Sequence, residues 1–440
     1  MKLAATASGC IRTDRSERFR RFLFQQAMNQ LDEKTAVYEP LKRLEQWVEQ
    51  TDWTAYDTFD GLASPYTRLL TFGNGFLKQV WQQSVRRFPL NLRPVLGIKP
   101  SKSTKAMGFF AQGYLKLYET YGDAAALGKA KSCLKWLVEN RSHSFRNYCW
   151  GNHFDYQSRG GAILKGTPTI VWTGLIGHAF LDAYDVTGEE EYLAVSNSVC
   201  KFIVEELGWF EGDGGICLRY YPNEEHQIHN SNIIGASVLA RVNALLPDPR
   251  YSKLARSAVD FTVRHQTAEG AWYYGVEPKY KWVDSFHTGY VLEALDSFNR
   301  YSGDSKYVGA LEQGYRYFVE TFFEGDGTPR YYDHKRRPLD IQCAAQGIQT
   351  LVNLRRLHPG SVALASTVAR WTIANMQDPT GYFYYRKYPL ITNKTPTLHW
   401  GQATMFAALA LLDQNLRSQA GASTAIPPSN RATAMLPQSV

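Results

Sequence analysis

Residues 286–304, FHTGYVLEALDSFNRYSGD, hold an apolar helix and the turn that ends it. Apolar residues occupy most sides of this helix, which is typical of a helix buried all round. Gly303 suits the left-handed position after a helix, and Asp304 suits the start of the next one. The next helix carries apolar residues spaced by three and four, namely Leu311, Tyr315, Phe318 and Phe322. The stretch therefore predicts a hairpin of a buried inner helix and an amphipathic outer helix.

The same pattern occurs six times, at intervals of 55 to 65 residues. The apolar helices open near Met107, Trp172, Ser231, Phe286, Cys343 and Trp400. A period of this size holds two helices and a connecting loop. Six such hairpins predict an all-α protein closed into a ring, an (α/α)6 toroid, with the loops that enter the inner helices meeting at one mouth. Gly-containing turns followed by paired aromatic residues predict short β-hairpins in those loops.

The repeats run without a linker, so we expect one toroid domain over residues 16–418. The hairpins occupy 107–418, and the N-terminal helices within 16–106 should close the ring. The last inner helix has no outer partner after it, and we expect the helix predicted at 67–87 to supply one. Residues 1–15 and 419–440 are polar or poor in large apolar residues and should be disordered.

The aromatic content, net charge and cysteine pattern of the chain limit the classes of function that it can have. Aromatic residues make up 14% of the chain, which suits flat surfaces that stack on sugars as well as helix packing. The net charge of +8 favours anionic partners, but the basic residues form no nucleic-acid-binding motif. No apolar run is long enough to span a membrane. Six cysteines lack regular spacing and indicate buried free thiols, which together with the absence of a signal peptide predict a cytoplasmic protein.

Three carboxylates before or near inner helices are candidates for catalysis, namely Asp155, Asp284 and Asp340. Two carboxylates that face each other across a cleft can split a glycosidic bond, one as acid and the other as base or nucleophile. Asp284 and Asp340 also suit helix N-caps, so a structural role competes with a catalytic one.

A second chemistry fits the same mouth. A histidine or tyrosine can abstract the C5 proton of a uronate while a cation neutralises its carboxylate, as in a lyase or C5-epimerase. The candidates are His229, His287, Tyr274, Tyr332, Arg159 and Arg219.

Further residues near the expected mouth should bind the substrate, an oligosaccharide or polysaccharide that is either neutral or anionic. They are Asp60, Arg93, Trp150, Arg159, Trp172, Tyr274, Tyr332, His399, Trp400 and Gln402. No metal-binding motif, phosphate-binding loop or nucleophile elbow occurs, so we expect neither a metal nor a cofactor.

Five segments carry a resemblance to a known superfamily: WGNHFDYQSR (150–159), HNSNIIGASVLARV (229–242), VDSFHTGYVLEAL (283–295), PLDIQCAAQGIQTL (338–351) and LHWGQATMFAALALL (398–412). Over residues 51–418 the chain resembles the six-hairpin glycosidase-like superfamily, and more narrowly proteins encoded in bacterial exopolysaccharide-biosynthesis clusters. The resemblance implies a role in making or trimming a surface polysaccharide. A polysaccharide-biosynthesis complex is therefore a candidate partner.

Three functions therefore stay open: a glycoside hydrolase-like enzyme, a uronate lyase or epimerase, and a non-catalytic scaffold that binds glycans or proteins. A toroid terpenoid cyclase is disfavoured because its DxDD and QW motifs are absent. The change Asp155→Asn separates enzyme from scaffold, since it should abolish glycan output only if Asp155 is catalytic.

Overall fold

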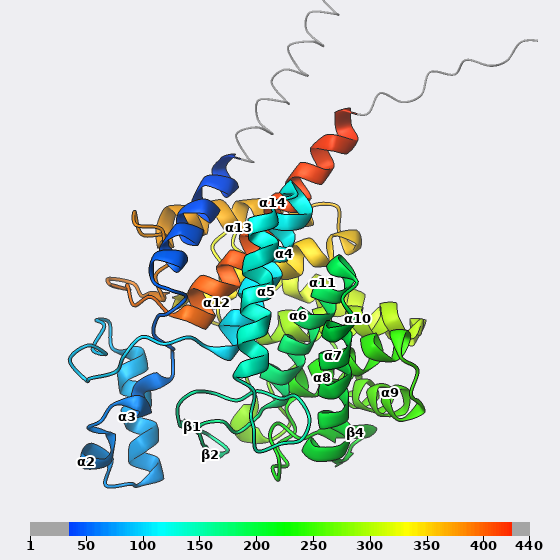
Figure 1. Ribbon diagram of the computed structural model, residues 1–440, viewed down its shortest axis with the longest axis horizontal. Coiled ribbons are helices and arrows are strands. Elements are labelled where there is room, and N and C mark those ends of the chain that lie inside the picture. Colours follow the sequence, from blue (N-terminus) through cyan, green and yellow to red (C-terminus); the bar gives the residue numbers. More distant parts are fainter. Residues whose placement is uncertain (1–34, 425–440) are drawn as a thin grey trace, which may run out of the picture.

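The computed structural model describes residues 35–424, and it shows a closed ring of helices (Figure 1). The inner helices are α4 (Thr104–Tyr121), α6 (Ile170–Thr187), α8 (His229–Leu245), α10 (Ser285–Ser302), α12 (Ile341–Asn353) and α14 (Thr404–Thr424). Each packs against the next, and α14 packs against α4. The predicted (α/α)6 toroid is therefore confirmed.

An outer helix packs against each of the first five inner helices. They are α5 (Ala124–Glu139), α7 (Glu190–Phe202), α9 (Pro249–Arg264), α11 (Val308–Phe322) and α13 (Ser361–Met376). Side chains between the two layers form the core. The ring closes tightly at α4 and α14, where a Cβ atom on Gly113 would lie 2.5 Å from Cδ1 of Phe406. Any larger residue would push these two helices apart.

The sixth outer position is taken by a helix that covers residues 35–50. Its Glu45 accepts a hydrogen bond from Lys129 Nζ of α5 at 2.9 Å, and its Arg43 donates to Gln377, next to α13, at 3.2 Å. The helix thus lies between the first and the last outer helix. Our prediction that 67–87 fills this position was wrong.

Residues 67–87 form two helices instead, α2 (Thr67–Thr71) and α3 (Gly75–Arg87), after a 3₁₀ turn at Asp60–Ala63. The helix breaks at Phe72, whose φ of 50° is left-handed, and Asn74 caps α3 by accepting a hydrogen bond from Leu77 N. The pair lies beside the mouth at one corner of the molecule (Figure 1).

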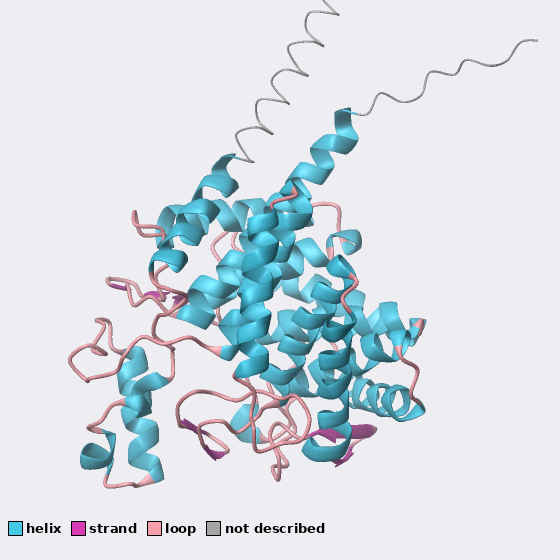
Figure 2. Cartoon of the chain, viewed as in Figure 1, coloured by secondary structure: helices cyan, strands magenta, loops and turns pink. Residues whose placement is uncertain are grey.

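Short antiparallel strands lie in the loops, as predicted (Figure 2). β1 (Tyr156–Ser158) pairs with β2 (Gly161–Ile163), and β3 (Trp209–Gly212) pairs with β4 (Gly215–Leu218). A three-stranded sheet joins β5 (Leu339–Asp340), β6 (Arg386–Lys387) and β7 (Thr392–Asn393). Short 3₁₀ turns occur at Pro278–Tyr280, Ser305–Tyr307 and Arg355–Leu357, and π-helical turns at Ile203–Leu207 and Leu398–Ala403.

The five cysteines among the described residues are buried free thiols, as expected. Within the same residues, no helix is long and apolar enough to cross a membrane. The segments that we expected to be disordered, 1–15 and 419–440, lie outside the described residues apart from the end of α14.

Candidate active site

A cavity of about 1080 Å³ lies at the mouth where the loops entering the inner helices converge. Its wall comes from α3, β1 and the segments before α8, α10, α12 and α14. Seven lysine and arginine side chains line it, against three carboxylates. This excess of positive charge favours a ligand that carries negative charge.

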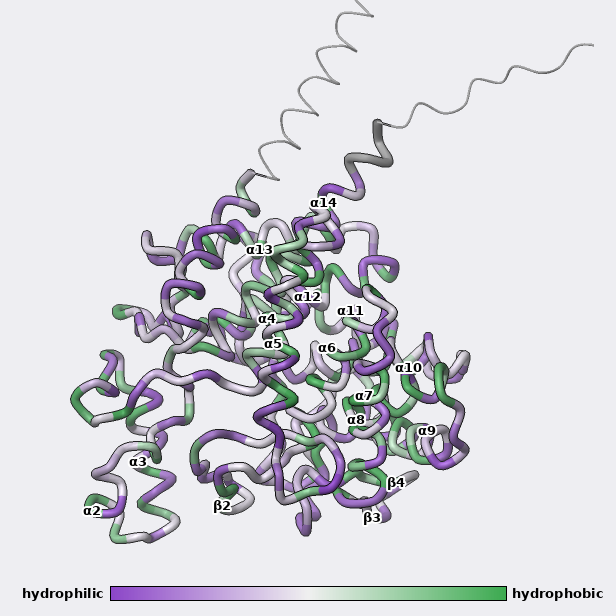
Figure 3. The backbone as a smooth tube through the Cα atoms, in the orientation of Figure 1, coloured by the Kyte–Doolittle hydropathy of each residue, from purple (hydrophilic) through white to green (hydrophobic). Residues whose placement is uncertain are grey.

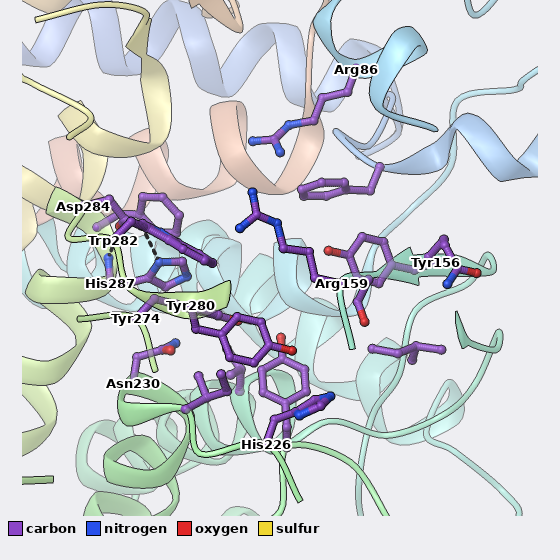
Figure 4. A pocket seen from close by; sticks show the side chains of 18 of the residues that line it. Arg86, Tyr156, Arg159, His226, Asn230, Tyr274, Tyr280, Trp282, Asp284 and His287 are labelled. Atoms are coloured by element: carbon purple, nitrogen blue, oxygen red, sulfur yellow. Dashed lines mark hydrogen bonds and ion pairs between the residues drawn. The ribbon is translucent and has the colours of Figure 1, made fainter. Parts of the chain in front are cut away.

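A histidine and a buried carboxylate form the most organised pair in the cavity (Figure 4). Asp284 caps α10 by accepting a hydrogen bond from His287 N at 3.0 Å. Its second oxygen accepts from Trp282 Nε1 at 2.9 Å and lies 2.8 Å from His287 Nδ1. Because a carboxylate accepts, His287 Nδ1 carries the proton and Nε2 carries the lone pair. No described residue bonds to Nε2, which leaves this atom for a ligand.

Aromatic rings surround His287. Tyr274 stacks on Trp282 with ring centroids 4.6 Å apart and 16° between planes, and it lies 4.5 Å from the His287 ring. The Arg159 guanidinium lies 5.0 Å from the Trp282 ring and donates to Lys279 O. These flat, rigid faces suit the apolar side of a sugar ring.

The floor of the cavity is formed near the N-termini of α4, α6 and α14. His399 lies in the π-helical turn before α14 and is 3% exposed, and neither ring nitrogen has a hydrogen-bond partner. Burial, and then the charge of Lys105, lowers the pKa of His399 well below 6.5. Burial lowers the pKa of Lys105 to about 8, although the negative charge of Asp57 opposes this shift. The Lys105 ammonium lies 4.4 Å from the Trp172 ring centroid.

A guanidinium enters the cavity from α3 (Figure 4). Arg86 lies 4.3 Å from the Phe59 ring centroid and 5.4 Å from that of Trp400, and its Nε donates to Tyr385 Oη at 3.0 Å. Its terminal nitrogens bond to no residue in the part of the chain that the structure describes. A guanidinium that is fixed by two rings but keeps free donors is well suited to a carboxylate.

A third carboxylate of the lining stands next to a histidine. Glu224 is 6% exposed, and one of its carboxylate oxygens, Oε2, has no partner. Burial raises the pKa of Glu224, while His226, 3.2 Å away, opposes the rise. A buried carboxyl group with a raised pKa can act as a general acid.

Eight of the residues predicted from sequence line the cavity. They are Arg159, Trp172, Tyr274, Asp284, His287, Tyr332, His399 and Trp400. The structure brings them together from segments far apart in sequence because each precedes or begins an inner helix.

Three predicted catalytic residues lie outside the cavity lining. Asp155 is exposed and accepts a hydrogen bond from Lys165 N at 2.9 Å. Asp340 is fully buried, caps α12 and pairs with Arg386. His229 is 2% exposed and packs against His265 and Phe261. The three carboxylates that we grouped for hydrolysis thus do not share the cavity.

Four predicted binding residues are also buried elsewhere. Asp60 and Arg93 form a buried ion pair at 2.7 Å, in which burial raises the pKa of Asp60 to about 6 and Arg93 opposes the rise. Trp150 is fully buried and donates to Leu137 O at 2.8 Å. Gln402 bonds to both backbone groups of Phe383. All four support the loops around the mouth.

Sequence reasoning missed Arg86, Lys105, Glu224 and Trp282. Lys105 had a usable signal, since it stands in the first turn of an inner helix, where the other repeats place His287 and Asn230. Arg86 had none, because α3 belongs to no repeat. Among the described residues, no group of three or more His, Cys, Asp and Glu side chains is arranged to hold a metal ion.

Buried histidines make stability depend on pH. Burial lowers the pKa of His178 and of His229 to about 3 and that of His399 well below 6.5, and it also lowers the pKa of His153. The unfolded chain therefore binds more protons than the folded chain below about pH 6.5. Stability should be fully present above about pH 6.5, and below it the first three histidines together should lower the free energy of unfolding by roughly 4 kcal/mol per pH unit, at about 1.4 kcal/mol each.

Urea denaturation across this pH range measures the slope. The variant His229→Leu should reduce the slope by about 1.4 kcal/mol per pH unit, since one of the titrating histidines is removed. An equal slope in the variant and the wild type would contradict the assignment.

The closed ring of six helix pairs with a cavity at one mouth defines the chain as an (α/α)6 toroid, the fold of the six-hairpin glycosidase-like proteins. No family model matches the sequence, and no curated protein is significantly similar to it.

Solved structures that share the fold include carbohydrate-active enzymes. A cellobiose 2-epimerase from Bacillus thermoamylovorans is 13% identical, with a TM-score of 0.56 over 72% of this chain and 88% of that one. An unsaturated glucuronyl hydrolase specific for heparin is 13% identical, with a TM-score of 0.53 over 72% and 86%. The GH76 α-mannanase BT2949 of Bacteroides thetaiotaomicron is 13% identical, with a TM-score of 0.52 over 72% and 88%. This level of identity establishes the fold alone.

Proposed function

We propose that the protein modifies an anionic saccharide in the mouth cavity by proton transfer at carbon, as an epimerase or lyase. The observation that carries this proposal is the His287–Asp284 pair. Asp284 fixes the imidazole with Nε2 free, and no second predicted carboxylate shares the cavity. A single oriented base beside several cations fits proton abstraction next to a carboxylate better than two-carboxylate hydrolysis.

In the proposed reaction, His287 Nε2 removes the proton from the carbon next to the sugar carboxylate or carbonyl group. The electron pair moves into that group, and a cation such as Arg86 or Arg159 stabilises the added negative charge. Reprotonation on the opposite face gives the epimer, and loss of a leaving group from the next carbon gives an unsaturated sugar. His399 on the floor is the candidate for the second proton transfer.

The test is to incubate the protein with a panel of neutral and acidic oligosaccharides in deuterium oxide and to measure the incorporation of deuterium into the sugars by NMR. The expected result is deuterium at the carbon next to a carboxylate or carbonyl group of one panel member. Production of reducing ends without deuterium at carbon would overturn proton transfer. Binding of a sugar without any chemical change would instead support a non-catalytic scaffold that holds glycans within a polysaccharide-biosynthesis complex.

Glycoside hydrolysis is the second candidate, and Glu224 favours it. This carboxyl group lines the cavity, is buried and has a raised pKa, as a general acid requires. Under this reading Glu224→Gln abolishes the release of reducing ends, while under the proton-transfer reading deuterium exchange persists in the variant.

Arg86 should set the preference for anionic substrates. The variant Arg86→Gln should raise the KM for an acidic saccharide by about 10-fold to 100-fold, because one charge-assisted pair is lost. The KM for a neutral sugar of the same size should stay within about twofold, and this comparison is the internal control. Equal effects on both sugars would show that Arg86 only supports the fold of the rim.

A further inference from the structure

One side of the mouth exposes apolar side chains at high density. Ten of the nineteen exposed large apolar side chains of the described residues lie between Tyr66 and Val95. These ten residues are Tyr66, Leu69, Leu70, Phe72, Phe76, Leu77, Val80, Phe88, Leu90 and Val95. Together with Leu390 and Ile391 they form the apolar rim. Clusters of this kind on a protein surface mark a site of interaction.

The turn between β6 and β7 belongs to the same side. Asn393 Nδ2 donates to Phe88 O at 2.8 Å, and Tyr388 Oη donates to Arg87 O at 3.4 Å, which fixes the β6–β7 turn beside the end of α3. Figure 1 shows this turn and the α2–α3 pair projecting from one side of the ring, and Figure 3 shows apolar segments on α2 and α3. The two tips are strongly exposed, with Phe72 at 83% and Leu390 at 100%.

The charge around the apolar rim is of one sign. Residues 61–118 contain no aspartate or glutamate. Arg68, Lys78, Arg87 and Lys99 stand among or next to the apolar residues, and none of the four forms an ion pair with a described residue. Projecting aromatic and aliphatic side chains flanked by unpaired cations are the pattern of a surface that enters an anionic bilayer.

We infer that the apolar rim binds the surface of a membrane containing anionic lipids. Phe72, Phe76 and Leu390 enter the acyl boundary, and the four basic side chains lie among the lipid phosphates. A second copy of the chain is a poor occupant, because two surfaces of the same positive charge repel each other. This inference does not depend on the chemistry in the cavity. Because Val80 and its neighbours on α3 also line the cavity, binding would hold the mouth at the lipid surface.

The test is sedimentation of the full chain with vesicles of phosphatidylcholine alone, or with about one third phosphatidylglycerol. We expect binding to the anionic vesicles that weakens at high salt. The double change Phe72→Asp and Phe76→Asp should lower the partition coefficient by about tenfold or more, since two inserted rings are replaced by anions. Both sites tolerate aspartate, because Phe72 has left-handed φ and Phe76 is in the first turn of α3.

The matched control is Trp209→Asp with Val308→Asp, which adds the same charge at exposed apolar positions outside the apolar rim. It should bind as the wild type does. Replacing Arg68 and Lys78 by glutamine should weaken binding to anionic vesicles by about fivefold for each charge. Circular dichroism checks that every variant is folded.

Two results would overturn the inference. The first is equal binding by the Phe72 and Phe76 double variant and the wild type, which would assign binding to another part of the chain. The second is failure of the wild type to bind anionic vesicles. Sedimentation velocity then distinguishes self-association, lost in the double variant, from a surface for another protein.

Discussion

Replacement of His287 by glutamine should lower kcat by about a thousandfold or more while KM changes little. The change removes a cavity histidine whose Nδ1 lies 2.8 Å from the buried Asp284 carboxylate and whose Nε2 has no hydrogen-bond partner among the described residues. General acid–base groups contribute about 10²-fold to 10⁴-fold to rate, and the upper part of this range applies where the base is oriented. Single-turnover measurement of deuterium exchange on the active panel sugar gives the rate.

Two variants serve as controls for this result. His143→Gln changes an exposed histidine outside the cavity and should leave the rate unchanged. Asp155→Asn should alter it by less than about twofold, because Asp155 is exposed and bonds only to a backbone N–H near its own strand pair. A rate in His287→Gln close to that of the wild type would remove His287 from the mechanism, whatever the fold.

Replacement of Asp340 by alanine should reduce the free energy of unfolding by about 3–5 kcal/mol. The change leaves the Arg386 guanidinium buried without its partner and removes the N-cap of α12. Removal of one member of a buried ion pair has a cost of this size because an uncompensated charge stays in the interior. Urea denaturation measures it, and the remaining folded protein should keep its specific activity.

The double variant Asp340→Ala with Arg386→Met provides the control. It removes both charges, so it should recover a large part of the lost stability. If Asp340→Ala is instead fully stable but inactive, Asp340 takes part in the chemistry, as its position before an inner helix first indicated.

Most of the fold could be predicted because the period depends on local features. Gly122, Gly188 and Gly303 end three of the inner helices in the left-handed conformation, and the three-four spacing of the outer helices can be read without tertiary information. The closing helix could not be chosen in this way. Residues 35–50 and 67–87 are both amphipathic, and only contacts such as Lys129 with Glu45 decide between them. A hint was present in the FGN sequence at Phe72, which breaks the second candidate.

The site was harder to predict because a position before an inner helix does not fix where the side chain points. Asp284 and Asp340 both cap inner helices, yet one lines the cavity and the other pairs with Arg386 behind it. The difference lies in the residue paired with each aspartate: β6 places Arg386 beside Asp340, whereas the corresponding bridge places Tyr332 beside Asp284. Such long-range pairing carries no signal in a single sequence.

The meeting of the first and last helices has a consequence for biosynthesis. The Arg417 guanidinium on α14 lies 5.4 Å from the Tyr38 ring of the 35–50 helix, so the two ends of the described chain are neighbours. During translation, α4 is made early and α14 late, so the contact between them can form only after α14 has left the ribosome. Until then, the apolar face of α4 that packs against α14 stays exposed. A circular permutant that joins these ends and reopens the chain in an outer loop would form this seam early in synthesis.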